Sequence, residues 1–144
     1  MKPGPFTYHD PGSVAEVVAL LARHEDARLL AGGQSLMPMM NMRFVVPDHV
    51  VDLNGVDAMA GIVDAGDALE IGAMTRQRDI MRSDLVRAKL PLAVEALGFV
   101  GHFQTRNRGT IGGSLAHLDP AAELPLVATL LDAELEIASS SGRP

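Results

Sequence analysis

A short apolar run that stops at two adjacent glycines and leads into a helical pattern constrains the fold more than any other feature. Leu29-Leu30-Ala31 is typical of a buried strand, and Gly32-Gly33 marks a tight turn after it. Ser35 is suited to cap the helix that follows. A second apolar segment, Val50–Leu53, predicts another strand. This order of elements predicts a small α/β lobe over residues 1–55.

The remainder of the chain, residues 56–144, predicts a second lobe that is more antiparallel. Two apolar runs, Ile62-Val63 and Leu69–Ile71, flank the turn-forming Asp64–Asp67 and predict a hairpin. Upstream, Ser13 and Glu16 form a capping-box pattern at the start of the first helix. Further elements are expected as helices over 75–82 and 91–97, a helix from Asp119-Pro120, and a strand at Leu135-Glu136-Ile137 that has no evident partner.

Composition excludes several classes of function. The chain has no cysteine, which excludes disulfides, thiolate zinc sites, a cysteine nucleophile and an iron–sulfur cluster held by this chain. Redox chemistry would therefore need a borrowed cofactor. The net charge of −6, without a cluster of Lys and Arg, gives no footprint for nucleic acid. The N-terminal residues lack an apolar signal-peptide core, and no apolar run is long enough to span a bilayer, so a cytoplasmic protein is expected.

The first glycine pair offers two interpretations. Between a strand and a helix, glycines let backbone N–H groups approach a phosphate, and Ser35 adds a hydroxyl donor. Alternatively, the pair is only a tight turn and Ser35 only a cap. The segment has neither the ending of a Walker loop nor the three glycines of the dinucleotide fingerprint.

A second glycine pair lies in Gly109-Thr110-Ile111-Gly112-Gly113-Ser114, with a hydroxyl residue on each side. This segment also reads as a simple turn or a β-bulge. Polar residues before it (104–108) and after it (117–123) gather many hydrogen-bonding groups around one loop. Two such loops could grip a diphosphate from two sides.

Two segments resemble the flavin-binding segments of one enzyme family. AGGQSLMPMMNMR (residues 31–43) and RNRGTIGGSLAHLDPAAELP (residues 106–125) are similar to those of the FAD-containing medium subunits of molybdenum hydroxylases. This is the carbon monoxide dehydrogenase and xanthine dehydrogenase family. The opening Met-Lys-Pro, Asp52-Leu53 and Ile71–Thr75 are similar as well, so the resemblance covers nearly the whole chain.

The resemblance implies an α+β fold: a two-lobed FAD-binding domain of the vanillyl-alcohol-oxidase (PCMH) type, truncated at its C-terminus. FAD would lie between the small α/β lobe and the second, mainly antiparallel lobe. The implied cofactor-binding residues are Ala31, Gly32, Gly33, Gln34 and Ser35 in the first loop, Thr110, Gly113 and Ser114 in the second, and Glu123 and Val100 elsewhere. Ser114 stands where many relatives have Asn, and Gln34 replaces other polar residues.

The implied function is electron transfer within a multi-subunit oxidoreductase. Electrons would reach FAD from [2Fe-2S] clusters of a small subunit, after substrate oxidation at the molybdenum cofactor of a large subunit, and would leave to an external acceptor. Medium subunits usually continue for about as many residues again, so a fragment, a split subunit completed by a separate chain, or a degenerate copy would all fit. A truncated interaction module and a phosphate-loop module for another nucleotide or coenzyme A stay open as alternatives.

Other side chains are discounted as catalytic or metal-binding groups. His9, His24, His49, His102 and His117 show no helix-face ligand spacing, so no metal site is predicted. The two serines of the glycine segments lack a partner base, which argues against a serine nucleophile. No catalytic residue is predicted on this chain.

Overall fold

The computed structural model describes residues 1–142, and the chain divides into two compact units. Unit 1 comprises Met1–Ala58 and the C-terminal segment that begins at Glu134; unit 2 comprises Met59–Ala133. The sequence-based boundary at residues 55/56 stays a prediction; of the C-terminal residues, 134–142 group with unit 1 here.

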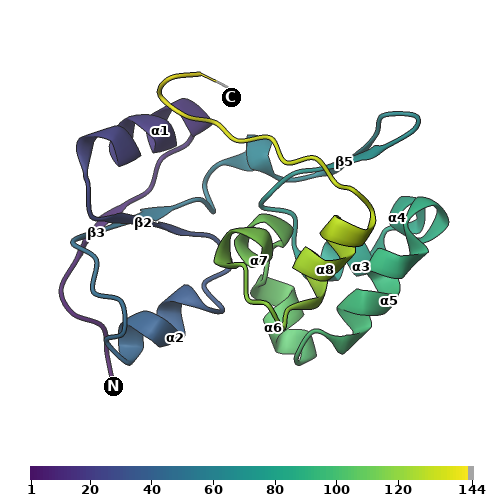
Figure 1. Ribbon diagram of the computed structural model, residues 1–144. Coiled ribbons are helices and arrows are strands. Elements are labelled where there is room, and N and C mark those ends of the chain that lie inside the picture. Colours follow the sequence, from purple (N-terminus) through teal and green to yellow (C-terminus); the bar gives the residue numbers. More distant parts are fainter. Residues whose placement is uncertain (143–144) are drawn as a thin grey trace. The chain divides into compact units, whose positions relative to one another are not determined.

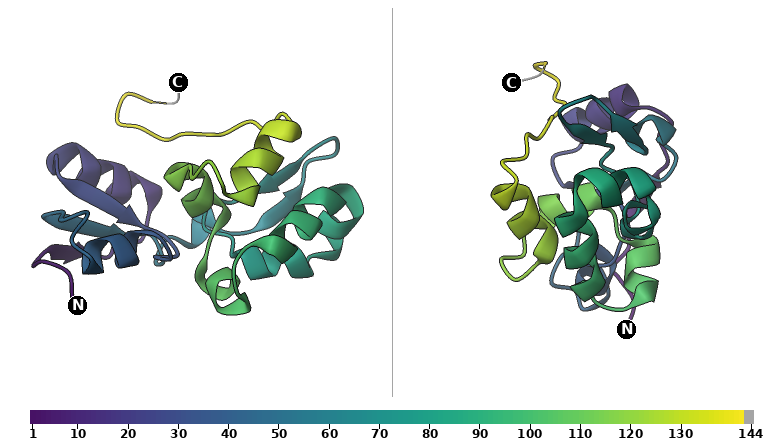
Figure 2. Two further views of the ribbon diagram at one scale, coloured as in Figure 1. Left: turned by 60° about the horizontal axis from the view of Figure 1, so that its bottom comes forward. Right: turned by 90° about the vertical axis from the view of Figure 1, so that its right-hand side faces the viewer.

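Unit 1 is built on a three-stranded parallel sheet with the order β1-β3-β2 (Figure 1). The strands are β1 (Thr7–His9), β2 (Ala27–Leu30) and β3 (His49–Asp52). Parallel neighbours need crossover connections, and α1 (Val14–Arg23) and α2 (Leu36–Asn41) supply them on opposite faces of the sheet (Figures 1 and 2). Central-strand residues Val50 and Val51 are therefore both buried, although their side chains alternate between the faces.

The start of α1 confirms the predicted cap. The Ser13 Oγ accepts a hydrogen bond from the Glu16 amide at 3.3 Å. Glu16 reaches back in turn, but its Oε2 accepts from the Gly12 amide at 2.8 Å rather than from Ser13. The Glu16 amide, which the first turn leaves unpaired, and the Gly12 amide just before the cap are thus satisfied by side chains.

Unit 2 combines the predicted hairpin with a helical layer. Strands β4 (Ile62–Asp64) and β5 (Leu69–Ile71) pair antiparallel. A short 3-10 helix, η1 (Asp57–Met59), precedes the hairpin. The helices are α3 (Gln77–Arg82), α4 (Asp84–Lys89), α5 (Pro91–Phe99), α6 (Phe103–Arg108), α7 (Ile111–His117) and α8 (Glu123–Leu130).

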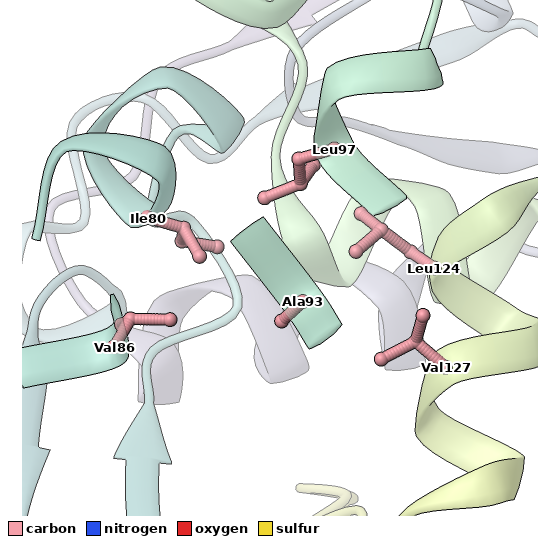
Figure 3. Packing of buried hydrophobic residues seen from close by; sticks show 6 residues of the cluster. All are labelled: Ile80, Val86, Ala93, Leu97, Leu124 and Val127. Carbon is pink, nitrogen blue, oxygen red and sulfur yellow. The ribbon is translucent and has the colours of Figure 1, made fainter. Parts of the chain in front are cut away.

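Helix α5 lies at the centre of the core of unit 2, where it packs against α3, α4 and α8. Pro91 at its first position suits a helix start, because the missing amide would have had no partner there. Figure 3 shows Leu97 of α5 and Leu124 of α8 in the same cluster, and both side chains are buried. The cluster consists of Ile80, Val86, Ala93, Leu97, Leu124 and Val127.

Three sequence-based assignments differ from the structure. The stretch 104–114, expected as a loop, contains most of α6 and the start of α7. Asp119 forms a turn instead of capping a helix, since its Oδ1 accepts from the Ala121 amide at 2.9 Å, and α8 starts only at Glu123. Residues 135–137 form no strand, because no strand pairs with them among residues 1–142. Within the same residues, no helix has the length and apolarity needed to cross a membrane.

Candidate functional site

The first glycine pair forms the turn between β2 and α2 in unit 1. Gly32 is buried, and its carbonyl accepts from Gln34 Nε2 at 3.3 Å. Gly33 has φ +73°, a conformation that disfavours other residues. A Cβ on Gly33 would lie 3.2 Å from Met37 Cγ and 3.3 Å from Leu30 Cδ1. The backbone angle therefore favours glycine at position 33, and a larger residue would also have to push the Met37 or Leu30 side chain aside.

This turn presents backbone donors that the protein itself does not use. The amides of Gly33, Gln34, Ser35 and Leu36 donate to no group within residues 1–142. The Ser35 side chain makes no capping bond, and the first turn of α2 carries no acidic residue that would compete for these amides. Successive N–H groups around a glycine in the left-handed region form an anion-binding concavity. The interpretation of this segment as an anion cradle agrees with that geometry.

The end of β3 braces the turn, which the sequence analysis did not foresee. The Leu53 amide donates to the Leu30 carbonyl at 2.9 Å, and Asn54 Nδ2 donates to the Ala31 carbonyl at 3.1 Å. Asp52 Oδ1 accepts from the Asn54 amide at 2.8 Å, and Asp52 Oδ2 accepts from the Tyr8 hydroxyl at 2.6 Å. That hydrogen bond raises the pKa of Tyr8 to about 12. The only sequence signal for these positioning roles is the pair of polar residues, Asp52 and Asn54, at and just after the end of β3.

The second glycine pair is the first turn of α7, in unit 2. Thr110 is the N-cap, and its Oγ1 accepts from the Gly113 amide at 3.1 Å. The Ile111 amide donates to the Thr75 carbonyl at 3.2 Å, and the Gly112 amide donates to the Ala73 carbonyl at 2.8 Å. The leading amides of α7 are thus already bonded within the protein, in contrast to those before α2.

Glycine at this second position serves close packing. A Cβ on Gly112 would lie 2.5 Å from Ala73 Cβ and 2.7 Å from the Ala73 carbonyl oxygen. A Cβ on Gly109 would lie 2.8 Å from Gln77 Oε1, a buried atom with no hydrogen-bond partner among residues 1–142. No sequence signal marked Gln77. Contacts to a ligand from this segment would have to come from side-chain hydroxyls.

The other predicted residues of unit 2 lie around α7. Ser114 is one turn after Thr110 and half-buried, and its hydroxyl makes no hydrogen bond within residues 1–142. Glu123 opens α8, which packs against α7. Val100 ends α5; its side chain packs against the unit 2 core and its carbonyl accepts from Arg106 Nη1 at 2.6 Å. Their roles toward a cofactor stay predictions.

Three of the discounted histidines come together in unit 1. His9, His24 and His49 lie on three different elements, with ring centroids 3.9–5.2 Å apart. Burial, together with His49, His9 and Arg23, lowers the pKa of His24. Spacing along the sequence could not reveal this cluster.

Residues 4–144 match the family model described as the FAD binding domain in molybdopterin dehydrogenase. The chain belongs to this FAD-binding family. The carbon monoxide dehydrogenase medium chain of Hydrogenophaga pseudoflava is 44% identical over 144 residues, which is 99% of this chain and 50% of that protein. The glyceraldehyde dehydrogenase medium chain of Sulfolobus acidocaldarius is 39% identical over 142 residues, or 99% of this chain and 50% of that protein.

Solved structures agree with the assignment of this FAD-binding domain. Carbon monoxide dehydrogenase from H. pseudoflava matches with a TM-score of 0.97 and 45% identity, covering 100% of this chain and 50% of that one. Quinoline 2-oxidoreductase from Pseudomonas putida 86 matches with a TM-score of 0.98 and 41% identity, covering 100% and 50% respectively. The resemblance and the α+β fold predicted from the sequence are confirmed. The chain spans about half the length of the relatives it matches.

The two units of this FAD-binding domain offer different kinds of hydrogen-bond donor to a dinucleotide cofactor: backbone amides in unit 1 and side-chain hydroxyls in unit 2. In unit 1, the unused amides around Gly33 suit a diphosphate, and no acidic side chain opposes it in the first turn of α2. In unit 2, Thr110 and Ser114 have hydroxyls with donor capacity, since Thr110 Oγ1 only accepts in the bond to Gly113 and the Ser114 hydroxyl is unbonded within residues 1–142.

Proposed function

We propose that this chain binds FAD and forms part of the flavoprotein subunit of a molybdenum-containing hydroxylase or dehydrogenase. The observation that carries the proposal is the turn at Gly33 in this member of an FAD-binding family, where the backbone angle favours glycine and the protein leaves the neighbouring amides unused. Similarity to medium chains of carbon monoxide and glyceraldehyde dehydrogenases supports the same reading.

Within unit 1, the amides of Gly33, Gln34 and Ser35 would donate to the diphosphate of FAD, and the Ser35 hydroxyl would add a donor. Asp52 and Asn54 would act as positioning residues, because they hold the strand end next to the turn through Ala31. Their contribution is orientation, since neither needs to touch the cofactor.

Within unit 2, we propose side-chain rather than backbone contacts to the cofactor. Thr110 and Ser114 offer hydroxyl donors, and Glu123 offers a carboxylate suited to hydroxyl groups of a nucleotide. Gly113 would keep a role in letting the ligand approach α7, and Val100 a role as an apolar neighbour.

FAD, when bound, takes up and releases electrons, which the side chains of this chain cannot do. We propose that the electrons come from [2Fe-2S] clusters on a small subunit, reached from a molybdenum cofactor on a large subunit, and leave to an external acceptor. These two subunits, and a separate chain if one completes the flavin domain, are the proposed partners. We also propose a cytoplasmic location, which cell fractionation tests.

The test compares two glycines with positive φ in the purified complex. Gly33 (φ +73°) lies in the turn, whereas Gly66 (φ +84°) lies in the β4–β5 hairpin, where a Cβ would meet nothing within 4 Å. Gly33→Ala and Gly66→Ala carry a similar backbone penalty of about 1–2 kcal/mol. Flavin absorbance per chain and FAD titration of the apoprotein by flavin fluorescence measure binding.

We expect Gly33→Ala to weaken FAD binding at least tenfold, which corresponds to about 1.4 kcal/mol. Its Cβ forces Met37 or Leu30 to move and displaces the neighbouring amides. Gly66→Ala should bind FAD as the parent does. The proposed function would be refuted if the parent complex contained no flavin and added FAD neither bound to it nor raised its stability. Equal FAD affinity in both variants would refute the role of the turn.

A further inference from the structure

The register of the parallel sheet in unit 1 places two histidines side by side. Thr7 pairs with His49 and His9 pairs with Val51, so His9 and His49 lie on the same face of neighbouring strands, two residues apart. The third histidine arrives from another element. His24 is the C-cap of α1, fixed by its amide, which donates to the Leu20 carbonyl at 3.0 Å.

The three rings present nitrogen atoms to one another at short range. His9 Nε2 and His49 Nδ1 are 3.0 Å apart and share a hydrogen bond. One nitrogen from each of the three rings lies within 4.8 Å of the other two. All three residues are half-buried, so the cluster is neither sealed from solvent nor fully hydrated.

Imidazole nitrogens are good ligands for Zn²⁺, Cu²⁺ and Ni²⁺. With Zn–N bonds of 2.0–2.1 Å and tetrahedral angles, two ligand nitrogens lie about 3.3 Å apart. The His9–His49 pair is already near that separation. The His24 ring stacks on His49 with an interplanar angle of 27°, so it must turn to aim its in-plane lone pair at a shared ion.

We propose that His9, His24 and His49 form a binding site for one divalent transition-metal ion of the Zn²⁺ type, with water in the remaining position. The ligand set resembles open zinc sites, which have three protein ligands. On binding, the ring that donates in the His9–His49 bond takes the tautomer with its proton on the other nitrogen, so both lone pairs face the ion. Arg23, next to His24, opposes a cation, but it is exposed and its charge is screened by water.

A bound metal ion would link β1, β3 and the end of α1, the three elements that carry the histidines. Strand β1 has three residues and lies at the edge of the sheet. A shared ion would link it to β3 and to the end of α1. The site is separate from the Gly33 turn, because His49 pairs with Ala27 at the start of β2, whereas the turn follows the other end of that strand. The proposed metal site does not depend on FAD binding.

The test measures Zn²⁺ binding to the intact protein in competition with a chromophoric chelator. We expect one tight Zn²⁺ site per chain, with a rise in the thermal unfolding midpoint that Mg²⁺ does not reproduce. His24→Gln and His49→Gln should each lower the Zn²⁺ affinity by more than the ~10–100-fold that loss of a second-shell partner causes. His102→Gln, which alters an exposed histidine at the start of α6, is the matched control and should bind as the parent does.

Coordination is checked with Co²⁺, whose visible spectrum reports a low-symmetry site and whose paramagnetism shifts the NMR signals of its histidine ligands. Three shifted histidines in the parent, and fewer in His24→Gln, are expected. His24 lies at the end of α1, and its backbone hydrogen bond to Leu20 does not involve the imidazole. The metal-free unfolding midpoint of His24→Gln should therefore match that of the parent, which separates lost binding from lost folding. Absence of tight Zn²⁺ binding in the parent, or equal affinity in the parent and both histidine variants, would overturn the proposal.

Discussion

Substitution of Gly112 by alanine tests whether α7 packs on residue 73 as closely as the structure shows. The added Cβ would lie 2.5 Å from Ala73 Cβ, whereas carbon atoms in contact are normally about 3.5–4.0 Å apart. A shift of about 1 Å would be needed. It would disturb the bonds from Gly112 to Ala73 (2.8 Å) and from Ile111 to Thr75 (3.2 Å).

The free-energy change follows from three contributions. Overpacking costs about 1–3 kcal/mol, and the two weakened hydrogen bonds cost about 1 kcal/mol each. The higher helix propensity of alanine offsets about 1 kcal/mol of this loss of stability. We therefore expect Gly112→Ala to lower the free energy of unfolding by roughly 2–4 kcal/mol.

The matched control is Gly98→Ala in the last turn of α5, where a Cβ would meet nothing within 4 Å. It should be neutral or stabilise the protein by up to about 1 kcal/mol. Urea unfolding followed by far-UV circular dichroism is a suitable assay, because six of the eight α-helices in the described residues belong to unit 2. An unfolding midpoint of Gly112→Ala at or above that of the parent, with an unchanged m-value, would refute the packing argument.

Two further predictions concern unit 1. Ser13→Ala should destabilise the protein by about 1 kcal/mol, because it removes the side-chain cap of α1. Ser35→Ala should change the stability of the apoprotein by only about a few tenths of a kcal/mol, since the Ser35 side chain makes no capping bond. Thermal unfolding compares the two variants, and equal losses of stability would contradict the assignment of the caps. Tyr8 is the only tyrosine and the chain has no tryptophan, so its ionisation can be followed by ultraviolet absorbance. The midpoint should lie near 12, and Asp52→Ala should bring it down toward 10. Because the folded pKa is raised, the stabilising effect is complete below pH 10 and is lost as the pH rises toward 12; a midpoint of 10 in folded protein would contradict the hydrogen bond.

Local signals explain which parts of the fold the sequence could predict. The cap at Ser13, the strand at residues 50–53 and the hairpin around 64–67 depend on neighbouring residues, and the structure contains all three within a residue or so. Strand β1 was not predicted, because its three residues are stabilised by pairing with β3, about forty positions away along the chain. The segment 135–137 alternates like a strand, but alternation alone supplies no partner strand.

The histidines show the same limit at the level of a site. His9, His24 and His49 lack any recognisable ligand spacing along the chain, and the parallel register together with the end of α1 brings them together. Ligand spacings typical of a helix face reveal metal ligands that lie on one helix. They cannot reveal a cluster whose residues come from three elements. The positioning roles of Asp52 and Asn54 could not be predicted for a related reason. Their partners, the Tyr8 hydroxyl and the Ala31 carbonyl, come close only when the chain folds.

The two glycine pairs are alike in sequence and different in physical role. At Gly33 the backbone needs a positive φ and the following amides are unused, so the local conformation itself creates the donors. At Gly112 glycine permits close approach to Ala73, and the approach consumes the amides that a helix start would otherwise offer. A glycine-rich motif therefore indicates an anion site only when its N–H groups remain unpaired after folding. By that criterion, the backbone of unit 1 offers an anion site, whereas unit 2 offers side-chain donors such as the hydroxyls of Thr110 and Ser114.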